Sequence, residues 1–529
     1  MSEQVKVAKA AGIVGGATLV SRVLGYIRDM VMSWAFGTGL AADAFYVAYR
    51  IPNLLRELLA EGSMSAAFIP VFTETLTKES KESAVHLANA VFARLLVILI
   101  LLTGLGILFA PFVVKVIAWG WMHKAGNEEK YLLGVTLTRI MFPYLLFIGL
   151  AALAMGVLNS LRSFLMPALS PVMLNVMIIS AVALGMRFLS QPVMGVAVGV
   201  VLGGMCQFLI QVPGLRKQGM RMRPEFTPSH PGVKKIGLLA LPVLLSSSVN
   251  QLNIFMGTIF ASFLPTGSIT YLFYGMRFIH FPLGIFGIAV ATAVLPSMSA
   301  QAARKEMAEF RETLSFGLRL VFFIMFPAMA GLIALRIPIV NLLLQHGRFD
   351  QASTAGVASA VLFYAVGLWS FAGVRIVVQA FYSLQDTRTP VKIAIIALVT
   401  NIVLSAAFVF WTPLAHGGLA LAASIASMVN ISLLTIQLRK KIGRMEGGRI
   451  RRSLFKIIPA SFAMGLIGWW ISRNPVWDVV GKTLFKSELL CGGLAISVLF
   501  YIAAMWVLKS EELEFIRGMI VRRRRRHGA

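Results

Sequence analysis

Six arginine residues stand inside apolar runs that predict membrane-spanning helices. They are Arg22, Arg28, Arg50, Arg56, Arg277 and Arg375. A charged side chain at the centre of a bilayer costs about 2.5–3.5 kcal/mol on insertion scales, so six of them must face protein or a water-filled cavity. Because a guanidinium group donates two parallel hydrogen bonds, it suits phosphate especially well. The six arginines therefore predict an anion-binding cavity within the membrane.

Few carboxylates are near enough in sequence to neutralise these arginines. The acids of the first two predicted helices are Asp29, Asp43, Glu57 and Glu61. Between Lys235 and Asp350, acids occur only in the loop segment 306–312, so Arg277 has no acidic neighbour. Arg375 is equally isolated, and an anionic ligand is the expected partner of both.

Other polar residues in the spans allow simpler interpretations. Arg22 could form a structural ion pair with Asp29, seven residues further on the same helix face. Lys115, Arg319, Arg336 and Arg94 are expected to extend to the membrane interface from positions near helix ends. His280 follows Arg277 by three residues and is either a packed polar residue or a proton switch.

Composition defines the elements that carry these residues. The 529-residue chain is 58% hydrophobic and 13% charged, with a mean hydropathy of +0.80. Long apolar runs recur throughout, which predicts an all-α polytopic membrane protein of about 14 transmembrane helices rather than a β-barrel. Glycines and prolines interrupt the runs that hold the arginines, at Gly37, Gly39, Pro52 with Asn53, and Pro282. Such breaks are tolerated where they line a cavity, and they provide bending points.

The net charge of +27 is best explained by topology. With the N-terminus placed inside, 31 Lys and Arg fall in predicted cytoplasmic segments and 7 in outside loops. Both termini are thus expected in the cytoplasm, where the tail VRRRRRHGA would contact anionic membrane lipids; nothing favours nucleic acid. No phosphate-binding loop, HExxH or CxxC motif is present, so we expect a transporter without catalytic residues, cofactor or metal.

Two short matches indicate an internal repeat. TGLAADAFY at 38–46 resembles TGSITYLFY at 266–274, and SLRSFLMP at 160–167 resembles SLQDTRTP at 383–390. An even number of predicted helices separates the copies, so the halves share one orientation. We expect two pseudo-symmetric six-helix lobes and two C-terminal helices. The predicted segments are an N-terminal lobe at 1–214, a linker at 215–235, a C-terminal lobe at 236–438, a linker at 439–455, the last two helices at 456–508 and a basic tail at 509–529.

Three segments of the chain carry long and specific motifs. They are SRVLGYIRD at 21–29, ADAFYVAYRIPNLLRELLAEGSMSAAFIPVF at 42–72, and FYSLQDTRTPVKIAI at 381–395. These segments resemble the MurJ (MviN) lipid II flippases of bacteria. The resemblance covers essentially the whole chain. It implies a fold of the multidrug/oligosaccharidyl-lipid/polysaccharide exporter superfamily in the bacterial inner membrane, with two lobes rocking around a central cavity. The implied activity is transfer of undecaprenyl-diphosphate-linked peptidoglycan precursor, lipid II, to the outer leaflet.

The resemblance also assigns site residues. The family's essential arginines correspond to Arg22, Arg28, Arg56 and Arg277, and further basic positions to Arg50 and Arg375. Asp29, Asp43, Pro52, Asn53, Glu61 and His280 are expected to support the cavity. The last two helices would form a groove for the lipid tail, and other cell-wall synthesis proteins are expected partners. Some family members carry an acid where this chain has His280 or Met276.

Two other functions fit part of the pattern. Any lipid-linked glycan with a diphosphate would suit the arginines equally well. A cation-coupled drug exporter of the same superfamily needs membrane carboxylates, which the C-terminal lobe lacks. A non-transporting scaffold would not retain six costly arginines.

Overall fold

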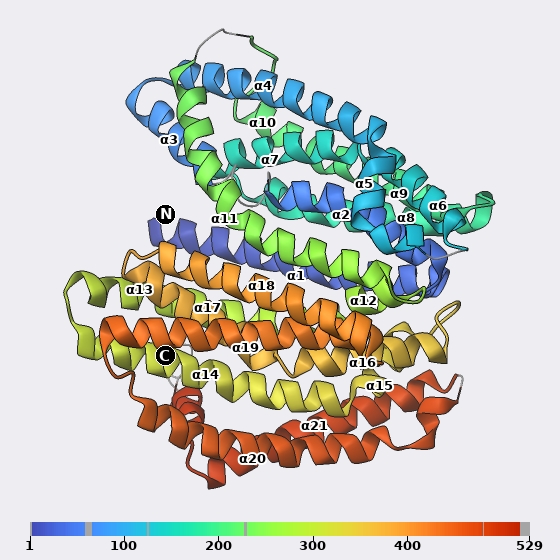
Figure 1. The fold of residues 1–529 in the computed structure, drawn as a ribbon. Coiled ribbons are helices and arrows are strands. Elements are labelled where there is room, and N and C mark those ends of the chain that lie inside the picture. Colours follow the sequence, from blue (N-terminus) through green and yellow to red (C-terminus); the bar gives the residue numbers. More distant parts are fainter. Residues whose placement is uncertain (1–2, 59–65, 124–125, 227–229, 480, 519–529) are drawn as a thin grey trace. The chain divides into compact units, whose positions relative to one another are not determined.

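The computed structural model describes residues 3–58, 66–123, 126–226, 230–479 and 481–518. The chain forms two compact units. The first comprises Met1–Ile269 with Gly347–Phe349, and the second comprises Thr270–His346 with Asp350–Ala529. Both units consist of helices, and the described residues contain no strand (Figure 1). The predicted all-α fold is confirmed.

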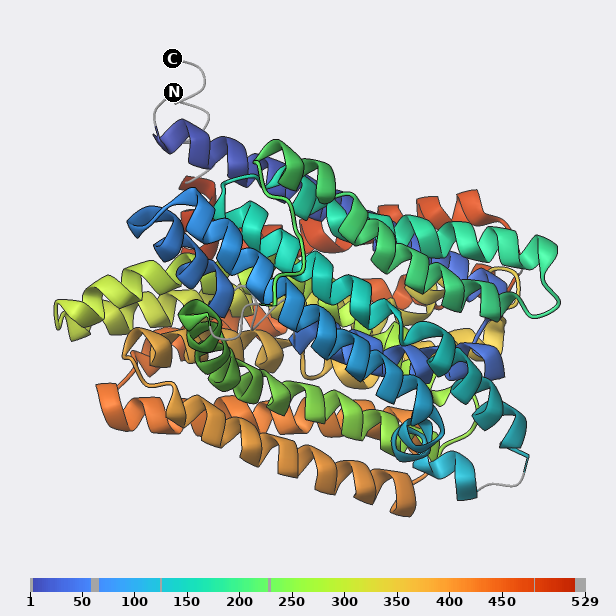
Figure 2. The ribbon, with the colours of Figure 1, turned by 90° about the horizontal axis from the view of Figure 1, so that it is seen from above.

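The helices of the first unit follow one another with short connections (Figures 1 and 2). They are α1 (Glu3–Phe36), α2 (Leu40–Arg56), α3 (Ile69–Lys78), α4 (Lys81–Leu108), α5 (Ala110–Ile117), η2 (Trp119–His123), α6 (Glu128–Met141), α7 (Tyr144–Ser160), α8 (Leu165–Phe188), α9 (Pro192–Leu209), α10 (Val212–Lys217) and α11 (Pro231–Ser262). A core of α3, α4 and α7 side chains includes the fully buried Phe68, Phe72 and Leu87.

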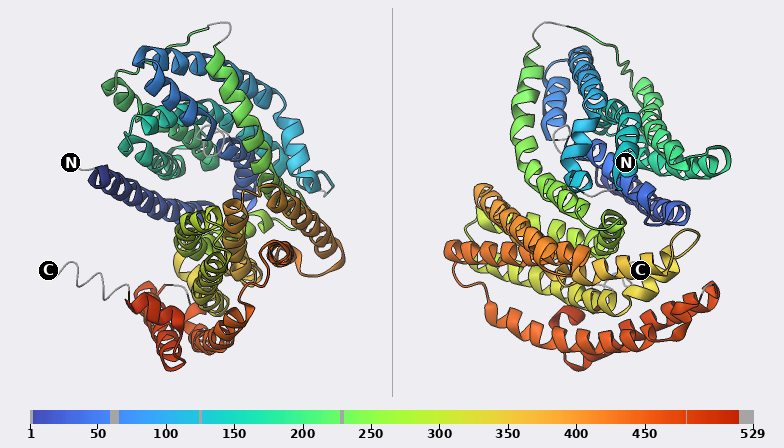
Figure 3. Two further views of the ribbon diagram at one scale, coloured as in Figure 1. Left: turned by 90° about the vertical axis from the view of Figure 1, so that its left-hand side faces the viewer. Right: turned by 45° about the vertical axis from the view of Figure 1, so that its right-hand side comes forward.

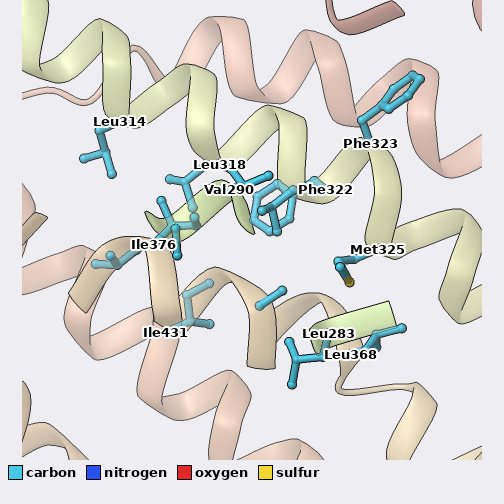
Figure 4. Packing of buried hydrophobic residues seen from close by; sticks show 14 of the residues in the cluster. Leu283, Val290, Leu314, Leu318, Phe322, Phe323, Met325, Leu368, Ile376 and Ile431 are labelled. Carbon is cyan, nitrogen blue, oxygen red and sulfur yellow. The ribbon is translucent and has the colours of Figure 1, made fainter. Parts of the chain in front are cut away.

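The second unit also consists of successive helices. They are α12 (Ser268–Pro282), η3 (Leu283–Gly287), α13 (Ile288–Ala303), α14 (Met307–Ala334), α15 (Arg336–Leu344), α16 (Gln351–Ala365), α17 (Leu368–Ser383), α18 (Arg388–Trp411), α19 (Ala415–Ile442), α20 (Gly447–Ser472), η4 (Pro475–Asp478) and α21 (Thr483–Val507). Leu318 and Phe322 of α14 pack against Ile376 of α17 and Ile431 of α19 in its core (Figure 4). The pair α20 and α21 lies side by side, and α20 also packs along α14 (Figure 3).

The predicted repeat is visible in the backbone. Leu161 (φ −87°, ψ 11°) ends α7, and Leu384 (φ −88°, ψ 9°) ends α17. The next residues, Arg162 and Gln385, both have φ of 58°. In the first copy, the backbone amide of Ser163 donates to the Leu158 carbonyl at 2.8 Å. In the second copy, the equivalent amide of Asp386 donates to the Phe381 carbonyl at 2.9 Å.

Breaks within helices also recur in the same order. Phe109 separates α4 from α5, and Leu335 separates α14 from α15. A short interruption divides α6 from α7, and α16 meets α17 at a bend of 43°. The predicted single span 353–383 is therefore a bent pair of helices. The predicted break at Pro282 is confirmed, because α12 ends there and a π-helical turn follows.

Ten helices of the described chain are long and apolar enough to cross a membrane, or eleven if the bent pair is counted. Helices α1, α2 with α3, and α11 fall outside that set, so the count of fourteen stays a prediction. The predicted lobe boundaries also stay a prediction. In this conformation the contacts of α11 lie with the first unit, although the repeat pairs this helix with the second lobe.

Candidate substrate-binding site

Arg28 is held in place by two neighbouring side chains in the first unit. Its Nε and Nη2 donate to Asp29 Oδ1 at 3.0 and 2.7 Å, and its Nη1 donates to Asn175 Oδ1 at 3.2 Å. Asn175 comes from α8, which packs along α1, and its amide donates to the Ser21 carbonyl at 3.1 Å. Asp29 is buried, and Arg28 is partly buried. Arg28 is therefore fixed in direction and partly neutralised.

Arg22 differs from Arg28 although it lies on the same helix. Its side chain is exposed, and no hydrogen-bond or ion-pair partner occurs among the described residues. The alternative in which Asp29 neutralises Arg22 is not realised in this structure, since Arg28 takes that carboxylate. Arg22 thus presents a full positive charge at the surface of α1.

The end of α2 carries a connected polar network. Asn53 Oδ1 accepts from Arg56 Nε at 3.2 Å, while Asn53 Nδ2 donates to Glu57 Oε1 at 3.0 Å. Gln251 of α11 donates to Glu57 Oε2. Arg56 Nη2 and Glu57 Oε1 are 3.7 Å apart, beyond hydrogen-bond length. Asn53 therefore joins Arg56 to Glu57, and Gln251 secures the carboxylate from another helix.

The remaining predicted positions of this unit lie around that network. Arg50 is partly buried two residues before the buried Pro52, which lies within α2. Glu61 lies outside the described residues. The predicted break does not occur at Pro52, because α2 continues through Pro52 to Arg56.

Asp43 forms a buried ion pair that the sequence analysis did not foresee. Its Oδ2 lies 2.7 Å from Lys130 Nζ and accepts from the Gly267 amide at 2.8 Å. Asp43 and Lys130 are 1% and 2% exposed, and the ammonium lies 4.7 Å from the centre of the Trp121 ring. Lys130 therefore belongs to the packed interior of this unit rather than to an exposed loop.

The second unit holds Arg277, His280 and Arg375. Arg277 lies over the Phe273 ring at 5.9 Å on α12, and His280 is exposed on the same helix. Arg375 is exposed on α17, and both guanidinium groups act electrostatically on His280. Neither α12 nor α17 contains an aspartate or glutamate. His280 therefore lies near two guanidinium groups, that of Arg277 on its own helix and that of Arg375 on α17.

Each unit therefore carries its own cationic set. Groups of three or more histidine, cysteine or carboxylate side chains that could hold a metal ion do not occur in the part of the chain that the structure describes. The arrangement is suited to bind an anion by hydrogen bonds and charge.

Comparison with known proteins identifies the family. Residues 32–486 match the family described as "Lipid II flippase MurJ". The chain belongs to the MurJ family. A Burkholderia cenocepacia relative named "Lipid II flippase MurJ" is 35% identical over 501 residues, which is 94% of this chain and 96% of the relative. A Vibrio cholerae relative named "Probable lipid II flippase MurJ" is 40% identical over 430 residues, 80% of this chain and 82% of the relative.

Solved structures agree with membership of the MurJ family. A structure titled "Lipid II flippase MurJ, inward closed conformation" superposes with a TM-score of 0.77 at 26% identity, covering 94% of this chain and 99% of that one. An inward-facing multidrug resistance MATE transporter of the MOP superfamily has a TM-score of 0.67 at 16% identity, covering 80% and 96%. The second likeness concerns the fold alone. With its apolar helices, this MurJ family chain is a multi-pass protein of the inner membrane.

One sequence-based interpretation of this MurJ family chain is wrong. Arg319 does not extend to the interface, because it is only 6% exposed and its Nη1 bonds Glu511 at 2.5 Å and Glu512 at 3.0 Å. Both acids follow α21, far along the chain. Asn175 and Gln251 were also missed, although each is an amide within a largely apolar helix, which is a signal for a buried polar contact.

Proposed function

We propose that this chain is a lipid II flippase that carries the undecaprenyl-diphosphate-linked precursor from the inner to the outer leaflet by alternating access. MurJ family membership supports this substrate. The observation that carries the mechanism is the cationic pair Arg277 and Arg375 on two helices without carboxylates. A diphosphate supplies the negative charge that these helices lack.

The proposed binding step uses both cationic sets. Arg22, Arg28, Arg50 and Arg56 are the proposed phosphate-binding residues of the N-terminal lobe, and Arg277 and Arg375 are those of the C-terminal lobe. Asp29 and Asn175 orient Arg28, so its remaining contacts are directed before the substrate arrives. No covalent step is needed, since the headgroup moves with its bonds intact.

The proposed path keeps the prenyl tail in lipid. Large apolar side chains stay exposed along α20 and α21, among them Phe462 (67%), Trp470 (76%) and Leu499 (65%). These faces are suited to contact lipid chains, which supports a role for α20 and α21 in guiding the tail. We propose that both termini lie in the cytoplasm, an orientation that the excess of basic residues in the corresponding loops supports.

A leaflet-accessibility assay tests this function. Cells depleted of the protein should accumulate lipid II that a probe of the outer leaflet cannot reach, and re-expression should restore access. Unchanged outward flux after depletion would reject the proposal. The same assay with a different diphosphate-linked glycan tests the second candidate, which the arginine chemistry supports equally.

A further inference from the structure

We infer that Gln251 is a positioning residue that keeps Glu57 from closing a hydrogen-bonded ion pair with the substrate-binding Arg56. The inference rests on the proposed function and adds a residue to it. Gln251 lies on α11, is 8% exposed and donates to Glu57 Oε2. It carries no charge, so it binds the carboxylate without altering the net charge around Arg56.

The geometry explains why Glu57 needs such a partner. It directly follows Arg56, the last residue of α2, in the chain. A carboxylate next to a guanidinium ordinarily forms a bidentate pair. Here Asn53 occupies Oε1 at 3.0 Å and Gln251 occupies Oε2, and the closest approach of Glu57 to Arg56 Nη2 is 3.7 Å.

Asn53 has a double role in the same network. Its amide nitrogen donates to Glu57, and its amide oxygen accepts from Arg56 Nε at 3.2 Å. Asn53 thus separates the two charges and fixes the plane of the guanidinium. Gln251 completes the arrangement from α11, and without it only one of the two carboxylate oxygens would be held by an amide.

Loss of Gln251 has a definite expected consequence. A carboxylate that loses a hydrogen bond becomes available to pair with a neighbouring cation. The guanidinium of Arg56 lies close, with Nη2 3.7 Å from Glu57 Oε1, and a closed Arg56–Glu57 pair would compete directly with the diphosphate. We expect Gln251→Leu to weaken binding of a diphosphate lipid about tenfold.

Four variants of the full-length protein in nanodiscs test the inference, with undecaprenyl diphosphate as the probe. Gln251→Leu should bind about tenfold more weakly than the unmodified protein. Glu57→Gln should bind more tightly, since it removes the competing charge. The double variant Gln251→Leu/Glu57→Gln should regain at least the unmodified affinity. Gln211→Leu is the matched control, because Gln211 is also buried, at 1% exposed, but donates to the backbone carbonyls of Ala151 and Gln207.

Each outcome bears on one claim. If Gln251→Leu binds normally, or if the double variant stays as weak as Gln251→Leu, the positioning role is rejected. If Gln211→Leu weakens binding as much as Gln251→Leu, the effect reflects packing and the role is likewise rejected. If the unmodified protein does not prefer undecaprenyl diphosphate over undecaprenol, the proposed function itself fails. Melting temperatures of all variants identify any that do not fold.

Discussion

At the scale of single residues, the arginines of this chain fall into different chemical situations. Arg28 forms an ion pair with Asp29, and Nη1 of Arg319 forms ion pairs with Glu511 and Glu512. Arg22 and Arg375 are exposed on their helices. The same residue type therefore serves as ligand, support or structural ion, and its partners decide which.

Arg277 is the arginine whose replacement should be most damaging to transport. Each hydrogen bond to a charged group contributes about 1.5–3 kcal/mol, so losing two should weaken diphosphate binding by roughly 100-fold or more. Arg277→Ala should abolish complementation of a flippase-depleted strain, and Arg277→Lys should rescue it only in part because lysine lacks the bidentate fork. The control is Arg473→Ala, which removes an arginine stacked on Trp469 at 3.8 Å. Normal growth of the Arg277→Ala strain at normal protein levels would exclude the assigned role.

Asp43 should act on stability rather than on substrate affinity. Asp43→Ala would leave Lys130 buried without its carboxylate, a change that costs about 3–5 kcal/mol. We expect a lower melting temperature, partly restored by Asp43→Asn/Lys130→Met, which removes both charges and keeps an acceptor for Gly267. Titration with undecaprenyl diphosphate should give similar dissociation constants for the folded variants. A selective loss of binding in Asp43→Ala would instead assign Asp43 to the cavity.

At the scale of elements, polar contacts connect helices that are distant in sequence. The chain after α21 turns back so that Glu512 reaches Arg319 of α14 and accepts from Ser453 of α20 at 3.0 Å. The ring of Phe515 packs edge-on against the ring of Phe316 beside this network, with the two ring centres 4.7 Å apart. Hydrogen bonding by Arg319 lowers the pKa of Glu511, which keeps that acid ionised. The last two helices are thus joined to α14 by charge as well as by packing.

The buried carboxylate of Glu512 is the critical member of that junction. Glu512→Ala should lower stability by about 3–5 kcal/mol, because Arg319 loses its buried partner. Glu514→Ala is the control, since Glu514 is exposed two residues away. Thermal melting of both purified variants checks the expectation, and equal melting temperatures would contradict it.

The contact between α3 and α11 should depend on pH. Hydrogen bonds from Lys235 and Lys78, at 2.6 and 3.0 Å, lower the pKa of Glu74 from 4.5 to about 2. A depressed carboxylate pKa stabilises the fold above the unfolded value, and this contribution disappears as the pH falls from about 4.5 toward 2. The difference in melting temperature between the unmodified protein and Glu74→Gln should therefore be constant above pH 5 and shrink below it. A pH-independent difference for Glu74→Gln would refute the assignment.

Features formed by residues close together in the sequence could be predicted, whereas contacts between residues far apart in the sequence could not. The breaks at Gly37 and Pro282 and the turns after α7 and α17 are local features, and the sequence indicates them directly. The pairs Arg28–Asn175, Gln251–Glu57 and Arg319–Glu512 join residues 147, 194 and 193 positions apart. No periodicity or composition encodes such pairings, because they depend on which helices pack together. The wrong interpretation of Arg319 and the missed Gln251 share this cause.

At the scale of the whole molecule, the charge distribution predicts on which side of the membrane each loop lies, and this prediction can be tested. In a variant lacking Cys206 and Cys491, a cysteine introduced at Asn474 should react with a membrane-impermeant maleimide in intact spheroplasts. A cysteine at Arg444 should react only after lysis. The reverse pattern would overturn the proposed orientation.

The paired turns after α7 and α17 have a consequence for the ancestry of the chain. Only Ser, Leu and Pro coincide between SLRSFLMP and SLQDTRTP, yet the backbone angles agree within a few degrees. A duplicated gene whose copies diverged would leave this result, because the left-handed residue that closes a helix is usually glycine, yet Arg162 and Gln385 both adopt that conformation here. Torsion angles at helix ends should therefore reveal the duplication in relatives whose two halves no longer align by letter.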